Sequence, residues 1–257
     1  MMASQITVNY HDMVAAISMN RSPVNAFDGE FLAQLNAAVD TCASEESVRV
    51  IVITSSLPGV FSAGADIRWL QTLDQIGCRE FIRLGQMSMD RIEELSKPVI
   101  AAVNGVCVGG GCELAMACDL RLAGSSARFG QPEVDLGLIP GWGGTQRLPM
   151  LIGKTRSMEL VMTGEQITAE MALSMGLVNQ IGPDEDVLTT AMGLARRLAC
   201  KSSASLTSIK KAVQRGHSLP LADGLKVEAD CFIEAYLSQD FHEGINAFLD
   251  KRPTQFH

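Results

Sequence analysis

The sequence predicts an α/β protein whose C-terminal third is helical. Two nearly continuous apolar segments, residues 48–54 and 98–103, are typical of strands buried on both faces of a parallel sheet. Residues 79–96 between them have a helical pattern, which predicts a strand–helix–strand unit. From about residue 168 onward the pattern predicts helices only, at residues 169–175, 186–200, 203–215, 221–238 and 241–249.

The N-terminal residues predict a hairpin followed by a helix. Apolar and β-branched residues cluster on either side of His11-Asp12, so we expect strands at residues 6–10 and 14–19. Asp28 can cap a helix, since its side chain can accept a hydrogen bond from a free N–H of the first turn. The expected inward face has apolar residues spaced by three and four, namely Phe31, Leu32, Leu35, Val39 and Cys42.

A second buried helix is expected directly after a run of glycines. Residues 112–118 are apolar except for Glu113, and a helix that is apolar all round is typically buried. A carboxylate in such a helix is unusual, because unpaired charges are rarely buried. Residues 119–123 then predict another strand.

The length and composition indicate a globular chain with one large domain and an appendage. The chain has 257 residues, of which 47% are hydrophobic and 19% charged, which is ordinary for a protein with a sizeable core. We place a boundary near residue 199. Residues 1–198 are expected to form the core domain with the active site, and residues 199–257 a helical region that contacts neighbouring subunits.

Charge and cysteine content exclude several classes of partner. The formal net charge of −8 argues against a nucleic acid or an anionic membrane as the main partner. No apolar run is long enough to span a bilayer, and the N-terminus lacks the features of a signal peptide. The cysteines number seven with no CxxC pair, which favours a reducing, cytoplasmic location. Cys107, Cys112 and Cys118 have neither ligand-type spacing nor a nearby histidine, so we expect no metal site.

Two glycine-containing turns could stabilise an oxyanion. Residues 64–66 and 109–111 each precede an expected helix, and glycines allow backbone N–H groups to point into a cleft. Each well-placed N–H donor contributes roughly 3 kcal/mol to stabilising such a charge. We expect the turns to follow the two buried strands and to meet at their carboxyl ends. The alternative is that both turns only connect a strand to a helix.

Glu113 and Glu133 each follow a glycine- or proline-containing turn and could perform acid–base chemistry. Two carboxylates in a partly dry cleft can hold different protonation states, so that one acts as acid and the other as base. The alternative is that each is a first-turn residue favoured by the helix dipole. Trp142, in a glycine-rich turn, could line a substrate pocket or fill the core.

Other catalytic patterns are poorly supported. The sequence contains neither a GxxxxGK[ST] phosphate loop nor a GxSxG nucleophile turn. The histidines lie far from the glycine turns in the sequence, so a Ser–His–Asp triad has no evident assembly; they are His11, His217, His242 and His257.

The segments that carry these turns and glutamates resemble the enoyl-CoA hydratase/isomerase (crotonase) superfamily. The resemblance extends from about residue 6 to the C-terminus, and the matching segments are residues 20–26, 61–67, 97–105, 109–119, 130–133 and 141–148. It implies a crotonase-like spiral of β-β-α turns with a helical C-terminal region. It also implies a homotrimer or a dimer of trimers.

The resemblance further implies an activity and site roles. The N–H groups of Ala65 and Gly110 would hold the thioester oxygen of an acyl-CoA. Glu113 would mainly activate a water and Glu133 protonate the α-carbon, so that water adds across the 2,3 double bond of a trans-2-enoyl-CoA to give a 3-hydroxyacyl-CoA. Further substrate contacts are implied at Ala63, Asp66, Ile67, Arg68, Gly141 and Trp142. No dissociable cofactor is implied, because coenzyme A is part of the substrate.

Alternative functions differ in the features they require. A Δ3,Δ2-enoyl-CoA isomerase, or another acyl-CoA enzyme of the superfamily, often keeps only one of the two carboxylates, whereas Glu113 and Glu133 are both present. An RNA-binding member would need a lysine-rich helix, which the acidic balance does not favour. Trp142 stands where many members of the superfamily carry a small residue, and Trp69 follows the Ala65 turn. The resemblance implies that both indoles lie near the acyl pocket and could restrict it to short, branched or cyclic groups.

Overall fold

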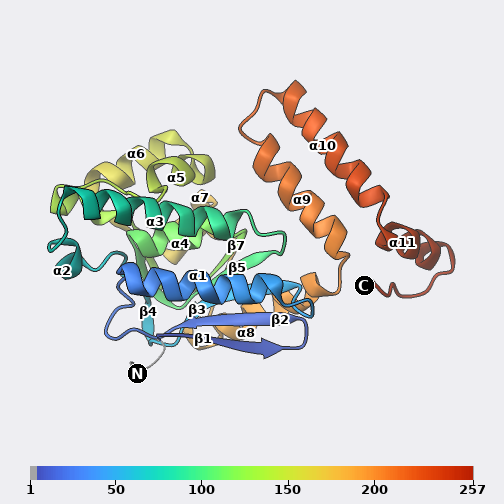
Figure 1. The fold of residues 1–257 in the computed structure, drawn as a ribbon, viewed down its shortest axis with the longest axis horizontal. Helices are drawn as coiled ribbons and strands as arrows, with labels where there is room; N and C mark the ends of the chain where they lie inside the picture. The colour runs from blue at the N-terminus through green and yellow to red at the C-terminus, as the bar shows by residue number, and fades with distance from the viewer. Residues whose placement is uncertain (1–4, 257) are drawn as a thin grey trace.

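The computed structural model describes residues 5–256 and arranges their strands in two sheets (Figure 1). Within that range the larger sheet has six strands in the order β1-β2-β3-β5-β7-β10: β1 (Ile6–His11), β2 (Val14–Met19), β3 (Val50–Ser55), β5 (Val99–Val103), β7 (Leu120–Gly124) and β10 (Gln180–Gly182). The smaller has four in the order β4-β6-β8-β9: β4 (Gly59–Ser62), β6 (Gly105–Val108), β8 (Arg128–Gly130) and β9 (Gln166–Thr168). Residues 1–4 and residue 257 lie outside the described range. The expectation that the N-terminus has no signal peptide falls mostly on residues 1–4.

Helices cover both faces of the larger sheet. Figure 1 shows α1 on one face and α8 on the other. The helices of the body are α1 (Gly29–Ser44), α2 (Ile67–Leu70), α3 (Gln75–Glu93), α4 (Gly110–Ala117), α5 (Gly144–Ile152), α6 (Lys154–Thr163), α7 (Ala169–Met175) and α8 (Val187–Ala199). Two short 3₁₀ helices are η1 (Pro132–Leu136) and η2 (Asp184–Asp186).

The strand β3 is buried on both faces, as its apolar sequence predicts. Ile51 and Ile53 belong to the main core cluster, which includes residues of α1 and α4. Val50 and Val52 point the other way and join a second cluster with residues of α8. Because each fully buried Val or Ile side chain contributes about 1.5–3 kcal/mol, this strand stabilises both layers of the fold.

The helix α1 begins and packs as the sequence predicts. The side chain of Asp28 accepts a hydrogen bond from the Phe31 N–H at 2.8 Å, and this cap satisfies one of the N–H groups that have no partner within the helix. The five residues expected on the inward face are all buried. Local capping and apolar spacing therefore determine where α1 starts and which side it buries.

Two expectations about strands are wrong. The region after residue 168 is not helical throughout, because Gln180–Gly182 forms β10, parallel to β7. A three-residue strand is too short to show an alternating pattern, so only its pairing with β7 defines it. The glycine turns also do not follow β3 and β5. They follow β4 and β6, two short strands that pair in the smaller sheet.

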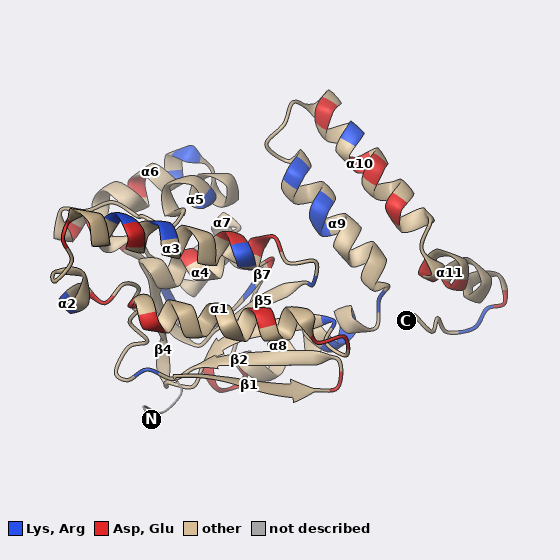
Figure 2. Cartoon of the chain, in the orientation of Figure 1, with Lys and Arg blue, Asp and Glu red and all other residues tan. Residues whose placement is uncertain are grey.

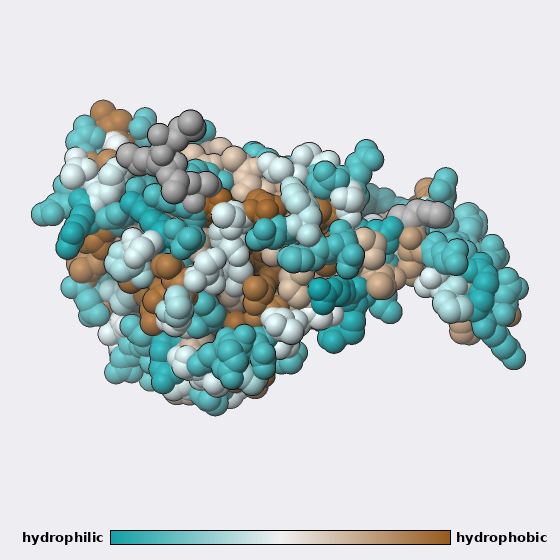
Figure 3. Space-filling model, turned by 90° about the horizontal axis from the view of Figure 1, so that it is seen from below, coloured by the Kyte–Doolittle hydropathy of each residue, from teal (hydrophilic) through white to brown (hydrophobic). Residues whose placement is uncertain are grey.

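Three C-terminal helices extend from the body: α9 (Ser203–Gly216), α10 (Leu221–Tyr236) and α11 (Gln239–Leu249). Figure 3 shows this extension from below as a lobe beside the body, and Figure 2 marks acidic residues along α10 in red. The α9 helix is held to the body where Lys210 Nζ donates to Asp119 Oδ2 at 2.8 Å. A domain boundary at residue 199 stays a prediction. Among the described residues, no helix combines the length and apolarity needed to cross a bilayer.

Candidate active site

The two glycine turns meet where the neighbouring strands β4 and β6 end. In that parallel pair Ser62 lies opposite Cys107, so both chains leave the sheet at the same edge. A Cβ atom added to Gly64 would lie 2.7 Å from the Gly110 nitrogen, which shows how closely the turns approach. Gly64 and Gly109 have φ values of 86° and 54°, a region that favours glycine. The chain therefore needs glycine here for both conformation and space.

The segment before α1 holds the first turn in place. The Phe27 N–H donates to the Gly64 carbonyl at 2.7 Å, and the Asp66 N–H donates to the Phe27 carbonyl at 2.9 Å. These two bonds bracket Ala65 in an isolated parallel bridge with Phe27. Ser62 Oγ also accepts from the Gly64 N–H at 3.0 Å. The backbone of Ala65 is thus fixed by its neighbours before any ligand arrives.

The second turn leads into α4, of which Gly110 is the first residue. The first N–H groups of a helix have no partner within the helix, and they carry its partial positive charge. Ala65 and Gly110 both line a cavity of about 130 Å³. Their N–H groups are the candidate donors to an oxygen that develops negative charge there.

Glu113 lies on α4 in the wall of the same cavity and is only 2% exposed. Its Oε1 accepts hydrogen bonds from the Trp142 N–H at 2.7 Å and the Gly144 N–H at 2.8 Å. Burial raises the pKa of this carboxyl above its usual value, whereas the two N–H donors and the Arg147 charge oppose that rise. Because burial is the larger effect, the pKa of Glu113 stays above its usual value.

Glu133 lies on η1 and also lines the cavity. Burial, with a smaller contribution from the nearby charge of Glu113, raises its pKa to about 7. With its amide nitrogen facing the carboxylate, Gln131 donates to Glu133 Oε1 at 2.9 Å and Oε2 at 3.1 Å. A carboxyl with this pKa can give or take a proton near neutral pH.

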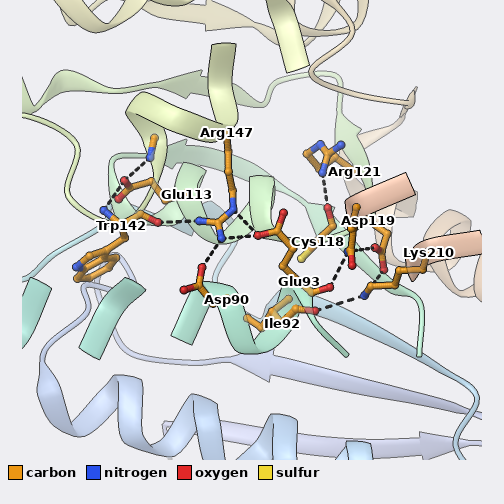
Figure 4. Close-up of polar contacts among 12 residues, drawn as sticks. Asp90, Ile92, Glu93, Glu113, Cys118, Asp119, Arg121, Trp142, Arg147 and Lys210 are labelled. Carbon is orange, nitrogen blue, oxygen red and sulfur yellow. Dashed lines mark hydrogen bonds and ion pairs between the residues drawn. The ribbon is translucent and has the colours of Figure 1, made fainter. Parts of the chain in front are cut away.

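Arg147, on α5, organises the turn that surrounds Glu113 (Figure 4). Its guanidinium donates to the Trp142 carbonyl at 3.0 Å, while the N–H of the same residue binds Glu113. Arg147 is itself held by Asp90 at 2.7 Å and by Glu93, both on α3. A Cβ added to Gly143 would lie 2.2 Å from the guanidinium, so this glycine provides its space.

Known proteins resemble this chain in sequence. The sequence model for enoyl-CoA hydratase/isomerase matches residues 9–257. The chain belongs to this family. It is 40% identical to a crotonyl-CoA hydratase of Syntrophomonas wolfei over 98% of this chain and 97% of that one. It is 37% identical to a short-chain-enoyl-CoA hydratase of Clostridium acetobutylicum over 94% and 93% of the two chains.

A solved structure shows the same fold. The crystal structure of enoyl-CoA hydratase from Bacillus anthracis superposes with a TM-score of 0.94, at 35% identity over 98% of each chain. The predicted crotonase-like α/β fold is therefore confirmed for this family member.

Most of the site residues expected from the sequence lie together at the cavity: Ala63, Ala65, Ile67, Gly110, Glu113, Glu133, Gly141 and Trp142. Asp66 instead caps α2 and pairs with Arg21 at 3.1 Å, and Arg68 is exposed on that short helix. Neither is part of the cavity lining. Substrate contacts for Asp66 and Arg68 stay a prediction.

Sequence reasoning missed the apolar wall and the second layer of polar contacts. The additional lining residues include Leu70, Phe81, Ile82, Leu136, Leu138 and Ile139. These are ordinary apolar residues, and only the spacing of the α3 residues could have suggested an inward face. Gln131 and Arg147 lie in the matching segments 130–133 and 141–148, but the sequence indicated no role for them. The Arg147 partners Asp90 and Glu93 are 57 and 54 residues away along the chain, so only the fold brings them together.

Proposed function

We propose that this family member is an enoyl-CoA hydratase that adds water across the 2,3 double bond of a trans-2-enoyl-CoA to give a 3-hydroxyacyl-CoA. The observation that carries the proposal is the pair of carboxyls, Glu113 and Glu133, on one cavity with the Ala65 and Gly110 N–H groups. A double-bond isomerase can use one carboxyl to carry a proton from C2 to C4, whereas in hydration one carboxyl can take a proton from water while the other delivers a proton to C2. The hydratase names of the relatives support the same assignment.

The proposed reaction begins with the thioester oxygen held by the Ala65 and Gly110 N–H groups. These donors draw electron density towards the carbonyl, which makes C3 electrophilic and stabilises the enolate that forms when water attacks. Glu113 accepts a proton from the attacking water, whose oxygen bonds to C3. Glu133 gives its proton to C2, and transfer of the proton from Glu113 to Glu133 restores the starting state. The chemistry uses protein groups and the coenzyme A that the substrate carries.

The test is loss of the conjugated-enoyl absorbance of crotonyl-CoA on adding the purified protein. We expect rapid loss with the wild type and a large reduction with Glu113→Gln and Glu133→Gln, each checked for folding by circular dichroism. Supplying a 3-enoyl thioester in parallel separates hydration from double-bond migration. A protein that converts the 3-enoyl thioester but does not hydrate the 2-enoyl thioester would contradict the proposal.

We also propose that the chain assembles as a homotrimer or a dimer of trimers. Large apolar side chains on the C-terminal helices are exposed, including Leu221, Phe232, Leu237, Phe248 and Leu249. They belong to the neighbouring helices α10 and α11 and the turn between them, and exposed apolar groups that form a patch usually mark a protein contact. Light scattering after size exclusion gives the mass directly, and a monomer at micromolar concentration would refute the proposal. The seven cysteines, all unpaired, support a cytoplasmic location, which fractionation would test.

A further inference from the structure

We infer that Trp142 limits the length of the acyl chain, and that Gly85 is the residue that allows its indole to occupy this position. The inference deepens the proposed function, because it assigns this chain to short acyl groups and names the residues that select them. It rests on how the indole is seated between two helices.

The indole of Trp142 lies between α3 and α4 and contacts both helices. A Cβ atom at Gly85 of α3 would lie 2.1 Å from Trp142 Nε1, and one at Gly110 of α4 would lie 2.4 Å from Trp142 Cζ3. The two opposite edges of the ring therefore touch helix backbones that only glycine leaves open. Any side chain at Gly85 would have to displace the ring or the helix.

Aromatic neighbours hold the ring in this orientation. Phe81 packs edge-on with a centroid separation of 5.1 Å, and Phe27 stacks on it at 6.0 Å. Trp142 is 2% exposed, and among the described residues its Nε1 has no hydrogen-bond partner. A buried indole N–H normally finds a partner, so the position is decided by the shape of the ring rather than by its polar group.

The ring stands where the acyl chain has to pass. In the proposed reaction the thioester oxygen lies at Gly110, which the indole touches, and C3 lies beside Glu113, to which the backbone N–H of Trp142 donates. Apart from Glu113 and Glu133, the side chains that line the cavity are apolar, among them Trp142, Phe81, Ile82 and Leu70. The cavity of about 130 Å³ is close to the engineered cavity of about 150 Å³ that holds benzene. A cavity of this size accommodates a short acyl group, and the indole occupies the space between α3 and α4 that a longer chain would need.

The experiment measures kcat/KM for crotonyl-, 2-hexenoyl-, 2-octenoyl- and 2-decenoyl-CoA with wild type, Trp142→Phe and Trp142→Leu. Because each methylene that a pocket accepts or rejects changes specificity by roughly 10-fold or more, we expect the wild-type values to fall steeply with length. In Trp142→Leu the ratio of decenoyl- to crotonyl-CoA turnover should rise at least tenfold. Trp69→Leu is the matched control. Its indole also packs on Phe81, at 4.7 Å, but does not line the cavity, so its length profile should match the wild type.

A double-mutant cycle tests the role of Gly85. Gly85→Ala alone should displace the indole and reduce turnover of crotonyl-CoA, and adding Trp142→Leu should recover part of that loss because the added methyl group then has space. No recovery in the double variant, with both proteins folded, would overturn the pairing of these two residues.

Binding of saturated acyl-CoAs separates this inference from the proposed reaction. Calorimetry with butyryl- and decanoyl-CoA needs no turnover, so it measures the pocket even in a protein that hydrates nothing. Tighter binding of decanoyl-CoA by Trp142→Leu than by the wild type, in the absence of any hydration, would retain the inference and refute the hydratase assignment. An identical length profile in wild type and Trp142→Leu, in turnover and in binding, would overturn the inference and leave the hydratase assignment intact.

Discussion

Arg147 offers the sharpest test of how the site is held together, because it lies outside the cavity lining. Its guanidinium holds the carbonyl of Trp142, and the opposite side of the same backbone turn holds Glu113 through two N–H groups. Arg147→Met removes the charge and the donors while keeping most of the side-chain length. The turn then loses its anchor to Asp90 and Glu93 of α3.

The expected loss of activity follows from the single hydrogen bond that Arg147 donates to the Trp142 carbonyl. A hydrogen bond to a charged group contributes about 1.5–3 kcal/mol. If that bond keeps Glu113 in its reactive position, its loss reduces kcat/KM by roughly 10- to 150-fold, since about 1.4 kcal/mol corresponds to tenfold in rate. Stability should change less, because Asp90 and Glu93 are partly exposed and can be hydrated again.

The pH profile distinguishes positioning from a general loss of structure. The charge of Arg147 lowers the pKa of Glu113, which burial raises. Without that charge the pKa rises further, so the ionised form of Glu113 appears only at higher pH and the acid limb of kcat/KM moves upward. Arg147→Lys keeps the charge but not the planar fork, so it should lower kcat/KM with a smaller shift of the limb.

The assay is the absorbance of crotonyl-CoA from pH 5 to 9, with folding checked by near-UV circular dichroism. Arg91→Met is the matched control, since Arg91 lies on α3 and pairs with Asp40 at the exposed surface, 3.0 Å away. It should leave both kcat/KM and the pH limb unchanged. A folded Arg147→Met protein with wild-type kcat/KM and an unshifted acid limb would refute the positioning argument.

Three further perturbations give separate tests. Because the pKa of Glu133 is raised to about 7, its protonated form predominates below that pH, and kcat/KM should fall as the pH rises above it; a flat pH–rate profile between pH 6 and 9 would contradict this. Gly64→Ala places a Cβ 2.7 Å from the Gly110 nitrogen and should reduce kcat roughly 100-fold or more in steady-state kinetics. Gly59 also has a positive φ but has open space around it, so Gly59→Ala should keep its activity. Lys210→Met leaves the largely buried Asp119 without its ion-pair partner and should lower the free energy of unfolding in urea by about 3–5 kcal/mol, against less than about 1 kcal/mol for Lys211→Met at the surface. Equal losses would show that burial is not the cause.

Much of the fold can be predicted from the sequence because it depends on local or periodic features. Asp28 caps α1 through the N–H of Phe31, three residues along, and the spacing of apolar residues defines the face that α1 buries. The nearly continuous apolar run of β3 indicates burial on both faces, because it has no alternation of apolar and polar residues. The short strands β4, β6 and β10 could not be predicted in this way, because strands of three or four residues are stable only through their neighbours.

The chemistry-bearing residues are likewise visible in the sequence, whereas their relationships are not. Glycine turns and two glutamates in apolar surroundings suggest oxyanion and acid–base chemistry by residue type alone. The tertiary structure decides that both turns leave one small sheet, that Glu113 receives two N–H donors from a turn held by Arg147, and that Trp142 fills the space left by Gly85. These contacts join residues far apart along the chain, and their pKa shifts and shape depend on burial that arises only when the separate elements pack together.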